Sequence, residues 1–218
     1  MTGARRPAVV PIVALMAVLM AALSAMPACA AAPPPCEACH GAQGEGMAAA
    51  HVPRLAGQAA DYLQKQLDDY ADGRRDNPIM ANFAKALSRQ ERMRFAARYA
   101  SMSAPYLAQT TALDAVSLAR GHQLAYQGDE AKRTPACNGC HGPDGIGVVH
   151  AAPYLAGQSA EYLAAALKAF QQGTRKNDAG QMMRSVVERL DDADIAALAG
   201  YFAGLATALN HEHAAPAR

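Results

Sequence analysis

The sequence predicts an all-α fold made of two tandem repeats. Segments of the first half return about 100 residues later, so that Gly73-Arg74-Arg75-Asp76-Asn77 corresponds to Gly173-Thr174-Arg175-Lys176-Asn177. A period of this length is too long for a solenoid and fits two globular domains. The chain is 51% hydrophobic but lacks Trp and has many alanine-rich stretches. That composition favours short helices over a β-sandwich.

Each repeat carries the same predicted helices. Residues 59–72 and their copy place apolar side chains on one face at helical spacing. That face is formed by Tyr62, Leu63, Leu67 and Tyr70 in the first repeat and by Tyr162, Leu163, Leu167 and Phe170 in the second. A glycine, Gly73 or Gly173, follows as a stop signal. The closing helix starts at a capping box, Ser88-Arg89-Gln90-Glu91, in the first repeat, and Asp191 is its predicted cap in the second.

The two repeats differ at their N-terminal ends. The second repeat has a predicted helix around residues 112–126, and the first has no equivalent. We therefore expect Phe95, Ala96 and Tyr99 of the first closing helix to lack cover from their own repeat. Because exposed aromatic side chains forfeit burial energy, we expect this face to pack against the second domain, the 103–111 linker or a partner.

Two short motifs carry the chemistry: Cys36-Glu37-Ala38-Cys39-His40-Gly41 and Cys137-Asn138-Gly139-Cys140-His141-Gly142. Cys-x-x-Cys-His is the attachment signature of c-type haem, in which both thiols bond to the porphyrin and the His reaches the iron. A zinc finger would need a second ligand pair at a suitable spacing, and a thioredoxin-like pair would follow a strand. Neither pattern is present. The sequence thus predicts two covalently bound haem c groups, attached at Cys36, Cys39, Cys137 and Cys140, with His40 and His141 as axial ligands.

A methionine in each repeat is the candidate for the second axial ligand. Met80 and Met183 each stand seven residues before a leucine, Leu87 or Leu190. A thioether is a weak donor that raises the haem potential, although the usual role of Met is core filling. Met182 is adjacent to Met183, and the shared register favours Met183. We expect Met80 to lie in a loop.

The N-terminus predicts export. Residues 1–30 have two arginines, an apolar run and an Ala28-Cys29-Ala30 cleavage site, which is the pattern of a signal peptide that leaves Ala31 first. An uncleaved membrane anchor and a lipidated Cys29 are the alternatives. We expect membrane association only through this N-terminal segment. In all three cases the functional part lies outside the cytoplasm.

Charge and loop signals set the remaining boundaries. The formal net charge is +1, and no basic stripe indicates nucleic-acid binding. Pro105 ends the closing helix of the first repeat. We expect a signal peptide (1–30), a first domain (31–107), a second domain (108–209) and a disordered tail (210–218).

The whole predicted mature chain resembles the dihaem cytochrome c4 family, in which two class I cytochrome c domains are joined head to tail. The motifs that match are Cys-x-x-Cys-His-Gly, Pro-x-Leu-x-Gly-Gln, the Tyr-Leu helix and the Met before a capped closing helix. The first domain departs from this pattern because it lacks the N-terminal helix. The resemblance implies that the carbonyls of Pro53 and Pro153 accept a hydrogen bond from the ligand His. It also implies periplasmic electron transfer to a terminal oxidase such as the cbb3 type.

Three functions compete. The first is an electron carrier, not an enzyme, between an upstream quinol-oxidising complex or dehydrogenase and a terminal oxidase. The second is a dedicated haem subunit of a periplasmic or membrane dehydrogenase. The third is a dihaem peroxidase, which would need an open sixth position on one iron. A Met at matching register in both repeats argues against the third.

Several further polar residues have weaker assignments. Arg75 and Arg175 are candidates for contact with haem propionates, with a solvated loop charge as the alternative. His51 and His150 are expected to be loop residues. The remaining histidines have no predicted role.

Overall fold

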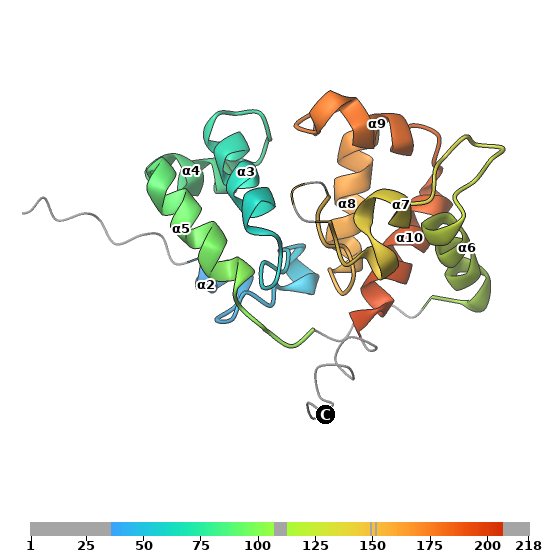
Figure 1. Ribbon diagram of the computed structural model, residues 1–218, viewed down its shortest axis with the longest axis horizontal. Helices are drawn as coiled ribbons and strands as arrows, with labels where there is room; N and C mark the ends of the chain where they lie inside the picture. The colour runs from blue at the N-terminus through green and yellow to red at the C-terminus, as the bar shows by residue number, and fades with distance from the viewer. Residues whose placement is uncertain (1–35, 107–112, 149, 151, 207–218) are drawn as a thin grey trace, which may run out of the picture. The chain divides into compact units, whose positions relative to one another are not determined.

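The computed structural model describes residues 36–106, 113–148, 150 and 152–206, and these are helical with only isolated bridges between extended residues (Figure 1). The all-α prediction is confirmed. The signal peptide, most of the linker and the C-terminal tail lie outside the described residues. None of the described helices is long and apolar enough to cross a membrane.

The two repeats follow one another along the chain. The first comprises α2 (Glu37–His40), η1 (Ala48–Ala50), α3 (Ala60–Ala71), α4 (Pro78–Ala86) and α5 (Arg89–Ala100). The second comprises α6 (Ala115–Tyr126), α7 (Asn138–His141), η2 (Pro143–Gly145), α8 (Ala160–Gln171), η3 (Ala179–Gln181), α9 (Met182–Val187) and α10 (Asp192–Gly204). The described residues of both repeats belong to one compact unit.

The helix ends follow the local signals. Ser88 and Asp191 each accept a hydrogen bond from the backbone at the third helical residue, whose side chain bonds back. The predicted capping box at Ser88 is therefore present, and Asp191, predicted only as a cap, forms a second one. Gly73 and Gly173 adopt positive φ angles of 74° and 69° directly after the residues that cap α3 and α8. A positive φ is costly for residues with a Cβ, which explains glycine at both stops.

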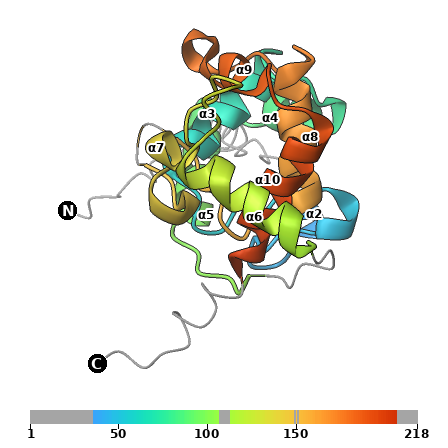
Figure 2. The ribbon, with the colours of Figure 1, turned by 90° about the vertical axis from the view of Figure 1, so that its right-hand side faces the viewer.

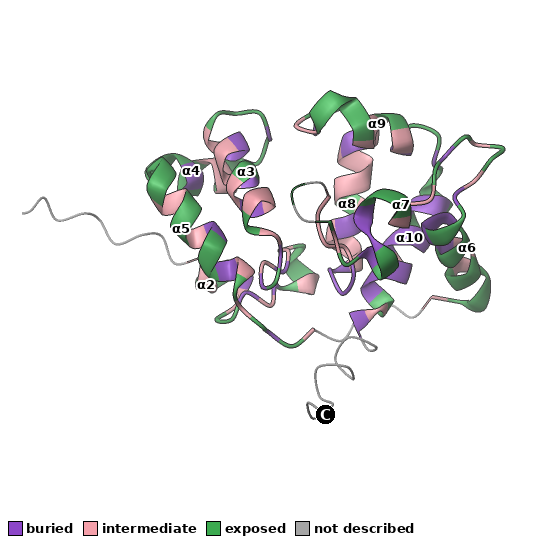
Figure 3. Cartoon of the chain, viewed as in Figure 1, coloured by how far each residue is buried: buried purple, intermediate pink, exposed green. Residues whose placement is uncertain are grey.

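Helix α6 covers α10 in the second repeat (Figure 2). The crossing is closest at Gly121, where an added Cβ would lie 2.4 Å from the carbonyl oxygen of Ala197 and 2.6 Å from the Cβ of Tyr201. Only a residue without a side chain permits this approach. As a result α10 is buried on nearly all sides, as Figure 3 shows, and it carries Ile195, Leu198 and Phe202 into the core.

The closing helix of the first repeat is covered differently from our expectation. Ala96 and Tyr99 are 2% and 3% exposed, and they pack with α3 and with loop residues of their own repeat. The residues of this cluster are Leu63, Ala96 and Tyr99, with Cys36, Leu55 and Met102 against it. Phe95 is half-buried. The expectation that this face lacks cover from its own repeat is therefore wrong.

Among the described residues only the second repeat has a helix ahead of its Cys-x-x-Cys-His turn, and the outer face of the closing helix differs between the repeats accordingly. The capping boxes align α5 with α10, so that Arg94 and Arg98 stand where Ala197 and Tyr201 contact α6. Both arginines are exposed, whereas Ala197 and Tyr201 are buried. The first repeat thus has charged side chains where the second has a packed helix, and α5 needs no apolar partner there.

The repeats contact each other through a pair of equivalent glutamines. The amide of Gln58 bonds to the backbone N and O of Tyr154 at 2.9 and 3.0 Å. The amide of Gln158 bonds in the same way to Arg54, at the same two distances. Each glutamine side chain thus satisfies one backbone N–H and one backbone C=O of the other repeat.

A buried carboxylate ties α6 to α10. Asp194 is 3% exposed and accepts hydrogen bonds from Lys132 and from Nε of Arg120, the latter at 2.7 Å. Burial raises the pKa of Asp194, but the hydrogen bonds from Arg120 and Lys132 outweigh it, so that the pKa lies below its usual value. A depressed pKa means that the stabilisation is present above the unfolded-state pKa of about 4 and is lost as the pH falls through the folded-state value.

We expect Asp194→Asn to destabilise the second repeat by about 1–3 kcal/mol at pH 7, because it removes the buried charge that accepts hydrogen bonds from two half-buried cations, Arg120 and Lys132. The loss should shrink as the pH falls below about 4, where the unfolded state takes up a proton, and vanish below the depressed folded-state pKa, where the native carboxylate is also protonated. Urea unfolding at several pH values measures both effects. Asp192→Asn is the control, since this neighbouring carboxylate has an exposed side chain. Equal effects of the two substitutions would contradict a role for the buried network.

Candidate functional site

The two Cys-x-x-Cys-His motifs form single helical turns, α2 and α7. Residues three and four apart lie on the same side of such a turn, so each His stands beside the two cysteines of its own motif. His40 and His141 are both 7% exposed. In each motif the first cysteine is half-buried and the second is exposed. Each turn thus has one cysteine packed against the core of its repeat, one exposed cysteine and a buried imidazole.

The imidazole of each motif is oriented by a proline carbonyl. Nδ1 of His40 lies 2.9 Å from the oxygen of Pro53, and Nδ1 of His141 lies 2.8 Å from the oxygen of Pro153. A carbonyl only accepts, so Nδ1 carries the proton and Nε2 keeps a lone pair for a metal. Burial lowers the pKa of both histidines, while the carbonyl hydrogen bond opposes this, and the net shift favours the neutral ring that binds metal.

The proline loop reaches its histidine through a close backbone approach at a glycine. The N–H of Gly46 donates to the carbonyl of His40 at 2.8 Å. Gly46 has φ of 84°, and a Cβ there would lie 2.6 Å from the backbone N of Arg54. Glycine at this position therefore lets the chain fold back so that Pro53 faces the imidazole.

The candidate methionines lie on helices. Met80 is half-buried in the first turn of α4, where its N–H donates to Oδ1 of Asn77 at 2.9 Å, so the prediction that it lies in a loop is wrong. Asn77 and Pro78 form a favourable helix start, which the sequence analysis missed. Met183 is half-buried and packs against the core of its repeat, whereas the side chain of Met182 is exposed.

Two arginines are buried at equivalent positions. Arg75 and Arg175 are 9% and 8% exposed, which excludes the alternative of solvated loop charges. Each donates to a tyrosine of the other repeat: Arg75 to Tyr162 and Arg175 to Tyr62, both at 3.1 Å. The other partners are the amide oxygens of Gln66 and Asn177. Neither arginine forms a salt bridge with a carboxylate of the described residues.

These two cations act on the phenol between them. Burial raises the pKa of Tyr162, but attraction by Arg75 and Arg175 outweighs it and lowers the pKa to about 8. Buried charges in proteins are normally paired. Two buried guanidinium groups with only neutral partners are therefore suited to anionic groups such as the propionates of haem. The donor set of the two repeats, namely paired cysteines, a neutral buried His and a buried cation, fits haem c.

Sequence reasoning missed the polar residues that join the repeats. Gln58, Gln158, Tyr62 and Tyr162 belonged to recognised motifs, yet the glutamines were given no role and the tyrosines were assigned to an apolar face. Their signal was present, because each polar residue recurs at a spacing of 100 residues. Solvent-exposed polar residues have no need to recur at a fixed spacing.

Two all-helical repeats, each with a Cys-x-x-Cys-His turn whose histidine is held by a proline carbonyl, define a c-type cytochrome with two haems. The Cytochrome c family matches residues 33–104 and 118–206. The chain belongs to the cytochrome c family and, within it, to the dihaem cytochrome c4 family. Its two domains bind covalent haem c, and it is an electron-transfer protein rather than an enzyme.

Relatives of two kinds are similar to the chain. The Thiosulfate dehydrogenase electron acceptor of Stutzerimonas stutzeri is 46% identical over 170 residues, which are 78% of each chain. A protein of the same name from Thiomonas intermedia is 41% identical over 192 residues, 86% of this chain and 88% of the relative. Cytochrome c4 of Pseudomonas aeruginosa is 40% identical over 172 residues, 78% of this chain and 83% of the relative.

Solved structures give the same two groups. Reduced recombinant cytochrome c4 from Pseudomonas stutzeri superposes with a TM-score of 0.70 at 36% identity, over 78% of this chain and 92% of that one. Thiosulfate dehydrogenase from Marichromatium purpuratum has a TM-score of 0.72 at 37% identity, over 77% of this chain. This chain spans only 36% of that enzyme's length.

Proposed function

We propose that the protein is a periplasmic carrier that accepts electrons from a thiosulfate dehydrogenase and passes them to a terminal oxidase. The observation that carries the donor is the similarity, at 46% and 41% identity, to two proteins named as electron acceptors of that enzyme. The similarity to part of a thiosulfate dehydrogenase supports the same donor. It also favours the earlier alternative of a haem protein that serves a dehydrogenase.

Each repeat supplies one set of haem contacts in this proposal. Haem c supplies an iron that gains and loses one electron. The thiols of Cys36 and Cys39, and of Cys137 and Cys140, hold the two porphyrins. His40 and Met80 in one repeat, and His141 and Met183 in the other, are the axial ligands. Pro53 and Pro153 keep each imidazole in the metal-binding tautomer, and Arg75 and Arg175 balance the propionates.

The test of the donor is reduction of the oxidised holoprotein by thiosulfate in the presence of purified Stutzerimonas stutzeri thiosulfate dehydrogenase. We expect the haem bands to show reduction on mixing, with no change when either thiosulfate or the enzyme is omitted. Mass spectrometry of the same preparation should show two covalent haems. A holoprotein that ascorbate reduces but thiosulfate with the enzyme does not would contradict the proposed donor.

The terminal oxidase as acceptor is what the resemblance to the cytochrome c4 family implies. Membranes that contain a cbb3-type oxidase should reoxidise the reduced protein in a cyanide-sensitive reaction. Absence of reoxidation would leave the dehydrogenase partnership intact and remove the oxidase from the proposal.

A further inference from the structure

The outer face of α5 is unlike the matching face of the second repeat. Helix α5 contains four arginines and one glutamate, whereas α10 contains two aspartates and no basic residue. Arg94 and Arg98 replace the residues that contact α6 in the second repeat. The face of α5 that corresponds to the α6-contacting face of α10 is therefore basic.

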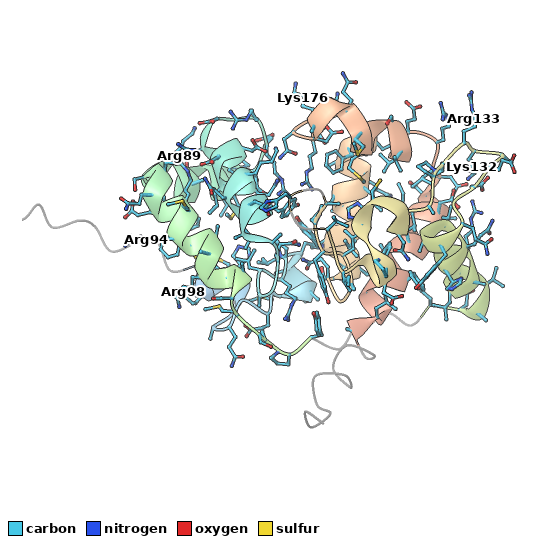
Figure 4. The ribbon with its side chains drawn as sticks, in the orientation of Figure 1. Arg89, Arg94, Arg98, Lys132, Arg133 and Lys176 are labelled. Carbon is cyan, nitrogen blue, oxygen red and sulfur yellow. The ribbon has the colours of Figure 1, made fainter. Side chains whose placement is uncertain are left out.

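We define the arginine face by the exposed residues Arg89, Met93, Arg94 and Arg98 of α5. Figure 4 shows that the three arginine side chains lie along the same side of the first repeat. The side chains of Arg94 and Arg98 are 69% and 51% exposed, and Met93 is 51% exposed. Arginine and methionine are both enriched in protein interfaces relative to the rest of the surface.

The charge of the arginine face is only partly balanced. Arg94 has its nearest described carboxylate, that of Glu91, at 3.9 Å, and that carboxylate is already engaged by the backbone and hydroxyl of Ser88. Arg98 pairs with Glu37 at 2.9 Å. Arg89 forms no salt bridge with any of the residues that the structure describes. Exposed pairs of this kind are weak, so these guanidinium groups remain available to an incoming carboxylate.

The arginine face adjoins the first haem-attachment turn. Glu37, the partner of Arg98, lies between Cys36 and Cys39 in α2. Cys39, which would hold the first haem, is itself exposed. A protein bound to the arginine face would therefore stand beside the first haem.

We propose that the arginine face docks an acidic surface of the protein that exchanges electrons with the first haem. The proposal rests on the electron-carrier function. Guanidinium groups bind carboxylates through two parallel hydrogen bonds, which a mobile redox partner can make and break rapidly. An anionic membrane is less well matched, because Met93 is the single large apolar side chain of the face and Glu37 and Glu91 adjoin it.

The test compares two charge-removing double substitutions in the full-length holoprotein. R94Q/R98Q removes two charges from the arginine face, and R133Q/K176Q removes two from exposed positions of the second repeat (Figure 4). The two variants have the same net charge, so a general electrostatic effect changes both equally. Neither pair belongs to the proposed haem contacts.

The first probe is flavodoxin hydroquinone, an acidic flavoprotein that gives one electron to a ferric haem and becomes the semiquinone. At low ionic strength we expect R94Q/R98Q to lower the second-order rate constant of reduction about tenfold, with a much smaller effect of R133Q/K176Q. The difference should vanish at about 0.5 M salt, where charges are screened within a few ångströms. Reduction by ascorbate should be equal in all three proteins.

The second probe is thiosulfate dehydrogenase with thiosulfate. If that enzyme fails to reduce the wild-type protein, the proposed donor is wrong, while the flavodoxin comparison still tests the arginine face. Equal rate constants for the two double variants with flavodoxin would overturn the proposal. A second result would also overturn it: the wild-type protein binds vesicles of phosphatidylglycerol, R94Q/R98Q does not, and the flavodoxin rate constant is the same for both. The arginine face would then be a membrane contact.

Discussion

With Met183 as the proposed axial ligand, we expect Met183→His to lower the reduction potential of one haem by roughly 0.2 V, a fraction of the ≈ 0.8 V over which axial ligands move haem potentials. Imidazole is a stronger donor than a thioether and favours ferric iron. The substitution should also remove about half of the weak charge-transfer absorption that a thioether bond to ferric iron produces. Met80→His should have the same effects on the other haem. A redox titration followed optically measures both quantities.

Met182→His is the matched control, because Met182 is adjacent in sequence but 57% exposed. We expect it to leave the potentials and the charge-transfer absorption unchanged. The opposite pattern, an altered spectrum in Met182→His and none in Met183→His, would show that the register of the second repeat is displaced by one residue. The half-buried position of Met183 against the core of its repeat argues against such a displacement.

Local signals predicted most of the helices and the chemistry of the two turns. The capping boxes and stop glycines depend on hydrogen bonds between residues fewer than five positions apart, so the sequence determines them directly. The register offset at the methionines was also visible, since Met183 follows Met80 by 103 residues while Arg175 follows Arg75 by 100. In the structure this insertion forms η3, which has positive φ angles at Gly180 and Gln181.

Contacts between distant residues could not be predicted in the same way. From the sequence, Arg75 could equally be a solvated charge in a loop. Its burial depends on hydrogen bonds to Tyr162 and Gln66, which lie on two different helices. Likewise, helical spacing alone assigned Tyr99 to an uncovered face. The structure shows that α3 and the first haem-attachment turn contact Tyr99, while the face of α5 that no described helix covers carries arginines.

The largest stability effect is expected at the crossing of α6 and α10. Gly121→Leu should destabilise the second repeat by roughly 3 kcal/mol, at the upper end of the usual cost of overpacking. The reason is that the backbone oxygen of Ala197 lies only 2.4 Å from the position of the added Cβ, and the backbone of a buried helix cannot shift as a flexible side chain can. For a domain of this size the change corresponds to a fall in melting temperature of about 15 °C. Thermal unfolding of the holoprotein followed by far-ultraviolet circular dichroism measures it.

Gly204→Leu tests whether the effect comes from the crossing rather than from adding a large residue to this pair of helices. Gly204 ends α10, is exposed, and would place its Cβ with no atom within 4 Å. This control should change the melting temperature by no more than a few degrees, since Leu is also the better helix former. If Gly121→Leu is tolerated as well as Gly204→Leu, α6 can move away from α10 at little cost. The packing of α6 would then contribute little to the stability of the second repeat. The first repeat has exposed arginines on the corresponding face of α5 instead of a packed helix.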